Sequence, residues 1–134
     1  MRLSSHAPPP RRIVDGNASG IGDSMLGRPM SDQPAVSRVV DLVSYQDGAV
    51  VSRIVVKRET GTVTLFAFDA GQELSEHTAP YDALVQVLEG DALITVAGHP
   101  HRVGAGEMLL MPAHRPHALK AVSRFKMLLT MIRA

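Results

Sequence analysis

From residue 36 onward the sequence predicts an all-β fold, an antiparallel sandwich or barrel. Short segments rich in Val, Leu, Ile and Thr follow one another, and glycine, proline, aspartate or charged turn residues separate them. No segment keeps an apolar period of 3.6 residues over ten or more positions with capping residues, as an amphipathic helix would. No βαβ pattern or internal repeat interrupts the series, so neither a parallel sheet nor a solenoid is expected.

Residues 1–35 differ from the rest in composition. They contain five prolines and four glycines but few apolar residues, too few to offset the cost of ordering the backbone. We therefore expect a flexible, disordered N-terminal tail at 1–35 and one ordered domain at 36–134. Two alternatives stay open: a docking or targeting arm that uses Arg11 and Arg12, or a natural start at Met30, where MSDQPAVS reads like an N-terminus.

The expected strands follow in order along the domain. The first two, 36–45 and 50–59, flank the turn QDGA, although one or two helical turns also remain possible at 37–46. The next strand is expected after Glu59-Thr60. Glu89-Gly90-Asp91 has the residue types of a tight hairpin turn between two further strands. The segments expected after the first two are 61–70, 83–90, 91–98, 107–112, 117–122 and 124–132.

The composition limits the possible functions. With 134 residues, 45% apolar and 20% charged, the chain can form one globular domain with one core. A net charge of +1 without a basic cluster argues against a nucleic-acid partner, and without cysteine there is no disulfide or thiol nucleophile. No apolar run approaches the roughly 18–20 residues that span a bilayer, and the N-terminus lacks the apolar region of a secretory signal. We therefore expect a cytoplasmic protein that binds neither membrane nor nucleic acid.

Two motifs in the domain resemble those of the cupins. Residues 71–90 (GQELSEHTAPYDALVQVLEG) resemble the first cupin motif, which combines His-x-His and a glutamate between two glycines. Residues 106–117 (GEMLLMPAHRPH) resemble the second motif, which runs from a glycine through a proline to a histidine. Over roughly residues 39–134 the chain is similar to small single-domain cupins of the RmlC-like type. This resemblance implies an antiparallel jelly-roll β-barrel, often found as a homodimer.

The chain departs from the cupin motifs at the metal-binding positions. Cupins bind one divalent metal through two histidines and a glutamate of the first motif and a histidine of the second. His77 and His117 match two of these ligands, whereas Ala79 stands at the second histidine position and Ala83, or next to it Leu84, at the glutamate position. The resemblance therefore implies a reduced two-histidine site, at which a divalent ion such as Zn, Ni, Mn or Fe would be held weakly. The alternative is two buried histidines that bond to each other, to a hydroxyl group or to water.

Strand alternation suggests which side chains share the interior with these histidines. Residues two apart on a strand lie on the same face, so Ser75, His77 and Ala79 are expected to line the barrel interior. Near the C-terminus, the same alternation allows Leu128 and Thr130 to project inward.

Two polar residues of the first motif would reach the interior only with a local irregularity. Gln86 faces inward if a bulge changes the alternation, and Asp82 does so only if its loop is shifted. The candidate ligand-binding residues are therefore His77, His117, Gln86 and Thr130, with His77 and His117 as the metal ligands.

The remaining candidate histidines are interpreted as surface residues. His114 lies in a proline-flanked turn. The spacing of His99 and His101 would place both on one face of a strand, where they could chelate a metal. Histidines beside a turn are more commonly exposed, and the resemblance places this stretch far from the centre of the barrel. These residues are therefore not included in the site.

Three functions are compatible with this sequence. The first is a binding module that holds a small organic ligand between the two histidines and apolar walls of Val85, Val87, Leu119 and Leu128. The second is a metal-dependent enzyme, an isomerase, lyase or dioxygenase acting on a small oxygenated substrate. The third is a dimer whose outer sheet docks a partner. The loss of two metal ligands favours the first, but the fold itself does not decide between them.

Overall fold

The computed structural model describes residues 12–15 and 35–134. These residues form ten strands in two sheets and one short 3-10 helix, η3 (Val39–Leu42). The strands are β1 (Arg12–Asp15), β2 (Ala49–Arg58), β3 (Gly61–Phe68), β4 (Glu73–His77), β5 (Tyr81–Glu89), β6 (Asp91–Val96), β7 (His99–Gly104), β8 (Met108–Met111), β9 (His117–Ala121) and β10 (Phe125–Arg133).

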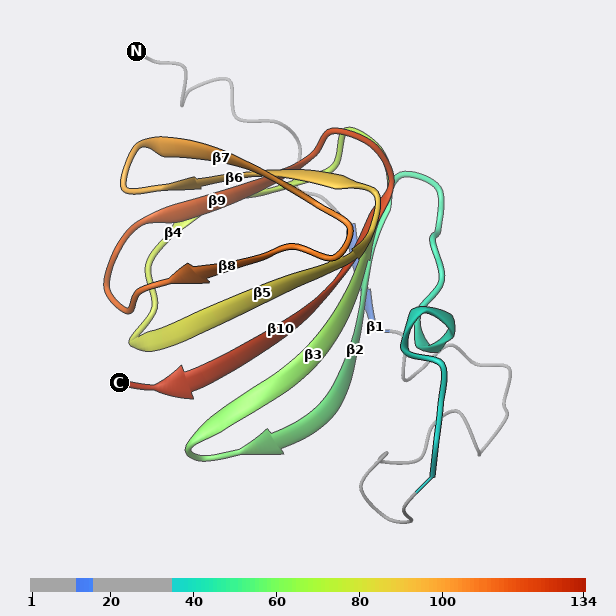
Figure 1. Cartoon of the computed structure of the whole chain (residues 1–134), viewed down its shortest axis with the longest axis horizontal. Coiled ribbons are helices and arrows are strands. Elements are labelled where there is room, and N and C mark those ends of the chain that lie inside the picture. The colour runs from blue at the N-terminus through green and yellow to red at the C-terminus, as the bar shows by residue number, and fades with distance from the viewer. Residues whose placement is uncertain (1–11, 16–34) are drawn as a thin grey trace.

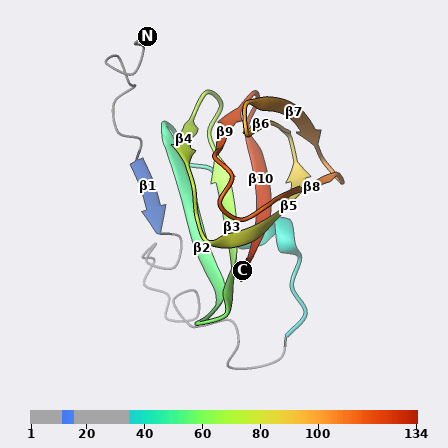
Figure 2. The same cartoon turned by 90° about the vertical axis from the view of Figure 1, so that its left-hand side faces the viewer.

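The two sheets face each other and form a jelly-roll barrel, as predicted. One sheet has the order β1-β2-β3-β10-β5-β8 and the other the order β4-β9-β6-β7. All neighbours are antiparallel except β1, which runs parallel to β2. Figure 1 shows the sheets converging at one end, where the chain crosses between them, and diverging at the other end, and Figure 2 looks along the barrel from the diverging end.

The core lies between the inner faces of the two sheets, and its burial changes along the barrel. At the converging end Phe68 and Phe125 are fully buried, with stacked rings whose centroids are 4.5 Å apart. Toward the diverging end the inward side chains are only partly buried, among them Leu74, Val96 and Met131. We call this diverging end the open end, because solvent reaches its inward side chains.

The first predicted strand, 36–45, is wrong. This segment forms η3 and an irregular stretch, which corresponds to the helical alternative left open from the sequence. Its Val43 is 3% exposed and packs against Val51, Leu65 and Ala67 on the outer face of the six-stranded sheet. An apolar outer sheet face needs a cover, and the segment provides it by packing on the face rather than by adding a strand.

The hairpin predicted at Gly90 is also wrong. The strands on either side of this glycine, β5 and β6, belong to different sheets. Gly90 has φ +79°, and a Cβ built on it would lie 1.9 Å from the carbonyl oxygen of Arg124. The glycine is therefore required by a tight crossing between the sheets and not by a hairpin turn.

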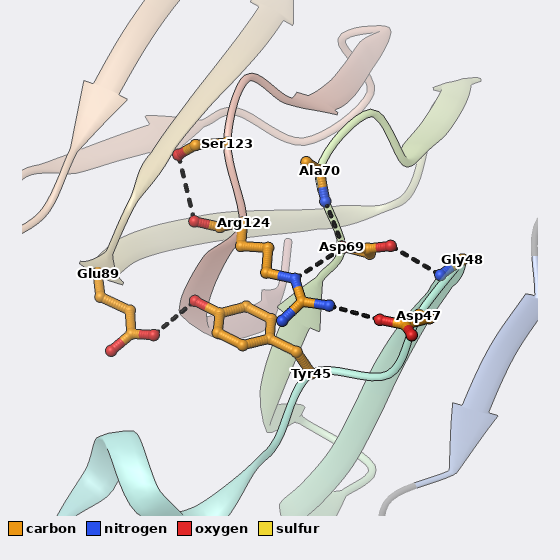
Figure 3. Close-up of polar contacts among 8 residues, drawn as sticks. All are labelled: Tyr45, Asp47, Gly48, Asp69, Ala70, Glu89, Ser123 and Arg124. Atoms are coloured by element: carbon orange, nitrogen blue, oxygen red, sulfur yellow. Dashed lines mark hydrogen bonds and ion pairs between the residues drawn. The ribbon is translucent and has the colours of Figure 1, made fainter.

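A polar cluster fixes the η3 segment to the converging end of the barrel (Figure 3). Arg124 donates hydrogen bonds to Asp69 at 2.8 Å and to Asp47 at 2.7 Å, and its guanidinium lies 5.1 Å from the ring centroid of Tyr45. The Tyr45 hydroxyl donates to Glu89 at 2.5 Å. Burial, reinforced by this hydrogen bond to Glu89 and its charge, raises the pKa of Tyr45, so the phenol stays protonated as a donor.

Asp69 is held in its charged form within this cluster. The backbone N–H of Gly48 donates to it at 2.7 Å, and this bond, followed by that from Arg124, lowers the pKa of the carboxyl group. The carboxylate of Asp69 therefore joins the turn at Gly48, the end of β3 and the start of β10.

The N-terminal tail prediction falls mostly outside the described residues. Residues 1–11 and 16–34, which include Arg11 and Met30, are not described. Between them, Arg12–Asp15 forms β1 at the edge of the six-stranded sheet, a strand that the composition did not predict. Among the described residues, no helix has the length and apolarity to cross a membrane.

Candidate functional site

His77 and His117 meet at the open end of the barrel. They are direct cross-strand partners on β4 and β9, and their ring centroids are 4.3 Å apart at an interplanar angle of 70°. A bulge makes this pairing possible. Leu74 pairs with Leu119, so two residues of β4, Ser75 and Glu76, lie opposite one residue of β9, Ala118. The bulge places His77 on the same inner face as Leu74, despite their odd spacing.

Both imidazoles are oriented by backbone carbonyl groups. The Nδ1 atom of His77 lies 2.8 Å from the carbonyl oxygen of Ser75, and that of His117 lies 3.2 Å from the carbonyl oxygen of Arg115. A carbonyl oxygen only accepts hydrogen bonds, so in each bond the Nδ1–H is the donor. In the neutral ring the Nε2 atom then carries a free lone pair, which can accept a hydrogen bond or bind a metal ion.

The two histidines differ in exposure and therefore in electrostatics. His77 is exposed, whereas His117 is 6% exposed. Burial is the main cause that lowers the pKa of His117, and the adjacent ring of His77 lowers it further, while the bond to the Arg115 carbonyl opposes the shift. The imidazole of His117 is therefore neutral near pH 7, with its Nε2 available as an acceptor.

We expect the stability of the fold to fall in mild acid because of His117. In the unfolded chain this histidine takes up a proton near its ordinary pKa of 6.5, whereas in the folded chain its pKa is lower. Its contribution is therefore fully present above about pH 6.5 and is lost as the pH falls toward the folded value. Urea denaturation would measure the free energy of unfolding at about pH 8 and at about pH 5.5. The decrease between the two pH values should be smaller for His117→Asn than for the natural protein.

The exposed His114 provides the control for this prediction. His114→Asn should retain the full loss of stability in acid, since this side chain is exposed in the folded chain. Equal pH dependence in His117→Asn and the natural protein would contradict the assignment.

A further polar group on the inner faces belongs to the open end. Thr62, on β3, pairs with Met131, whose side chain packs against the core. Its Oγ1 atom is buried and has no hydrogen-bond partner among the described residues. Such an atom loses its hydrogen bond to water on folding, so a ligand group that bonds to it would be favoured. Thr62 is not among the residues predicted for the site, although the alternation of β3, with Phe66 and Phe68 inward, could have indicated it.

Thr130 and Gln86 are not brought to the histidines. On β10 the inward residues are Met127, Leu129 and Met131, so the alternation predicted for this strand is displaced by one residue. Thr130 therefore lies on the outer face, and Leu128 packs in the outer cluster beneath the η3 segment. Phe125 determines which residues of β10 face inward, because its side chain is fully buried against Phe68.

Gln86 is exposed on the outer face of β5. Its strand neighbours Val85 and Val87 are buried in the core, and no bulge interrupts β5 at this point. The condition under which Gln86 would face inward is therefore not met. Asp82 is also outside the site, since its carboxylate accepts the backbone N–H of Ala113 at 2.9 Å.

The two alanines lie at the open end but supply no ligand. Ala83 is 3% exposed on the inner face of β5, where it pairs with Met111 and Met131. Ala79 is half-buried, and its carbonyl oxygen accepts the N–H of His114 at 2.8 Å. Within the described residues, no three histidine or carboxylate groups converge as metal ligands. The described residues therefore lack the four ligands of the cupin motifs and provide two imidazole ligands only.

His99 and His101 are exposed, as interpreted from the sequence, and strand register places both on the inner face of the four-stranded sheet. His99 pairs with Val96, which is partly buried against the core, and His101 pairs with Ile94, which is fully buried in it. Val96 also pairs with His117, so His77, His117, Val96 and His99 form one row across the sheet. The His-x-His spacing of His99 and His101 is the sequence signal that these two side chains share a face.

Known proteins resemble this chain in both sequence and fold. A sequence model of the cupin domain matches residues 64–133. No curated protein sequence matches the chain. A conserved protein of unknown function from Streptococcus pyogenes is 36% identical with a TM-score of 0.74, and the match covers 78% of this chain and 92% of that one.

Two other solved structures give the same picture. A cupin superfamily protein from Desulfitobacterium hafniense is 27% identical with a TM-score of 0.72, covering 76% of this chain and 94% of that one. An RmlC-like cupin from Desulfovibrio desulfuricans is 27% identical with a TM-score of 0.65, covering 75% and 97%. The chain belongs to the cupin family.

Proposed function

We propose that the chain binds a small oxygenated organic ligand at the open end of the barrel, with His77 and His117 as its polar anchors. The observation that carries this proposal is the pair of imidazoles whose Nδ1–H groups are both taken by backbone carbonyls. Two Nε2 lone pairs accept hydrogen bonds from ligand hydroxyl groups. Partly buried apolar residues of both sheets, including Leu74, Leu129 and Met131, would contact its carbon skeleton.

A metal-dependent enzyme is the second candidate function. The same tautomers that leave the Nε2 atoms free to accept hydrogen bonds also leave them free for a divalent ion such as Zn, Ni, Mn or Fe. Two imidazoles alone would hold such an ion weakly, and oxygens of the substrate would have to complete its coordination.

The experiment that tests these proposals is analysis of the untagged protein as purified. Native mass spectrometry would detect a retained organic molecule, and elemental analysis would detect metal. We expect a bound organic molecule in the natural protein and in His114→Asn, but not in His77→Asn or His117→Asn. Circular dichroism should show that all three variants keep the β-fold, because His77 and His114 are exposed and His117, although buried, lies at the open end, away from the fully buried Phe68 and Phe125.

The outcomes separate the two functions. Stoichiometric metal that is lost in His77→Asn and His117→Asn would support the enzyme. An organic molecule retained equally by both variants would contradict the role of the histidines.

We also propose that the protein is a homodimer, as the resemblance implies, and that it is cytoplasmic, as the composition led us to expect. The outer face of the six-stranded sheet exposes Met108, Leu110 and Ile132 to 62%, 53% and 59%. Apolar side chains gathered on one sheet face support contact with a second copy. The molar mass in solution, measured by light scattering, tests this proposal.

A further inference from the structure

We propose that His99 and His101 form a second site, a two-imidazole chelate for a divalent transition-metal ion at the free edge of β7. This inference is independent of the function proposed for His77 and His117. It rests on three observations: the face that the two side chains share, their exposure, and the absence of competing partners in the described residues.

Strand register places both imidazoles on one face. His99 and His101 pair with Val96 and Ile94, and Val103 continues the same face into the core, where it is 4% exposed. Alternate residues on a strand lie roughly 6.6 Å apart, a spacing that two imidazoles span when both bind one ion at about 2.0–2.1 Å. The strand thus fixes the Cα positions of the two ligands before the ion binds.

The site is open to solvent. Both histidines are exposed, and among the described strands β7 pairs only with β6, at the edge of its sheet. Pro100, between them, has no N–H to donate, which is compatible with a free strand edge. An ion bound here could therefore keep water molecules in its remaining coordination positions.

The two imidazoles have no other role in the described structure. No described residue forms a hydrogen bond, ion pair or ring contact with either of them. Arg102, the nearest cation in sequence, pairs with Leu93 on the opposite face of the sheet and reaches Asp91 at 3.5 Å. Its charge is therefore directed away from an ion held by the histidines.

The second site is separate from the His77 and His117 pair. Val96 stands between His117 and His99 in the row, so these two residues are two strands, or roughly 9–10 Å, apart. No three ligand groups of the described residues converge on one point. Each pair would therefore bind its own ion. Imidazole ligands suit Ni, Cu and Zn, and Ni²⁺ is a suitable probe because it binds nitrogen ligands more tightly than Mn²⁺ or Fe²⁺.

The test is calorimetric titration of the untagged, EDTA-treated protein with Ni²⁺. The variant His77→Asn/His117→Asn removes the first pair, and we expect it to bind one Ni²⁺ still. Adding His99→Asn/His101→Asn should abolish this binding, and His99→Asn alone should weaken it at least about 10-fold. His114→Asn, which removes a lone exposed histidine, should have no effect.

A second measurement keeps the test valid if the variant that lacks the first pair folds poorly. In the natural protein, His99→Asn/His101→Asn should lower the number of bound Ni²⁺ ions by one, and Ni²⁺ should broaden the backbone amide signals of β7. Unchanged Ni²⁺ binding in the His99→Asn/His101→Asn variant would overturn the proposal. Failure of the first site to bind a ligand would leave this result unaffected, so the two proposals fail separately.

Discussion

Gly90→Ala is expected to destabilise the barrel by at least about 4 kcal/mol, a large part of the total stability of a domain this size. The new Cβ would lie 1.9 Å from the carbonyl oxygen of Arg124 and 2.8 Å from the Cα of Phe125. Both atoms belong to the backbone at the start of β10, so a rotating side chain cannot relieve the overlap. Urea denaturation followed by circular dichroism would measure the loss.

Gly98→Ala is the matched control. This glycine has nearly the same backbone conformation, φ +83°, but a Cβ there would have no atom of the described residues within 4 Å. The substitution should therefore cost only about 1–2 kcal/mol for the left-handed conformation. If Gly90→Ala were as mild as Gly98→Ala, the close packing of the crossing against Arg124 and Phe125 would be wrong.

Gly90 also shows which part of the fold the sequence could predict. Each strand expected from residue 50 onward corresponds to an observed strand, because alternation and turn residues act locally. The partner of each strand depends on contacts distant in sequence, and a glycine between two strands has the same residue pattern in a hairpin and in a crossing. The motif resemblance supplied the jelly-roll topology that the local pattern did not.

The site was predicted as far as the pairing of its two histidines. His77 and His117 are 40 residues apart in the sequence, and only the resemblance brought them together. Strand alternation failed for Thr130, because β10 has apolar residues on both faces. Its sequence therefore does not show which of the two sets of alternate residues faces inward. It also could not foresee the bulge in β4, which allows Leu74 and His77 to share the inner face.

His99 and His101 illustrate the opposite case. Their spacing alone predicted that they share a face, and the structure confirms this. What the sequence could not give was which face, since that depends on how β7 pairs with β6. A residue pattern therefore specified the arrangement of two ligands but not their place in the barrel.

The second large effect is expected from restoring the two missing metal ligands. In Ala79→His/Ala83→Glu, two direct ligands are added to His77 and His117. We therefore expect the affinity of this open-end site for Ni²⁺ to rise at least about 100-fold over its affinity in the natural protein. Without metal, the carboxylate at the buried position 83 should destabilise the fold by about 3 kcal/mol. Added Ni²⁺ should reverse this loss, which thermal denaturation with and without the ion would measure.

Ala79→His/Gln86→Glu is the matched control. It adds the same histidine and the same negative charge, but does not place the carboxylate among the metal ligands. Gln86 lies on the same strand as Ala83 but is exposed on the outer face, so a carboxylate there cannot reach an ion held by His77 and His117. This variant should neither lose stability nor gain Ni²⁺ affinity beyond the effect of Ala79→His alone. An equal gain in both variants would show that the carboxylate acts at a distance. A folded Ala79→His/Ala83→Glu protein without tighter binding would show that the alanines do not occupy the ligand positions of a cupin, because the inward face of β5 and the histidine pair would then lie too far apart to share one ion.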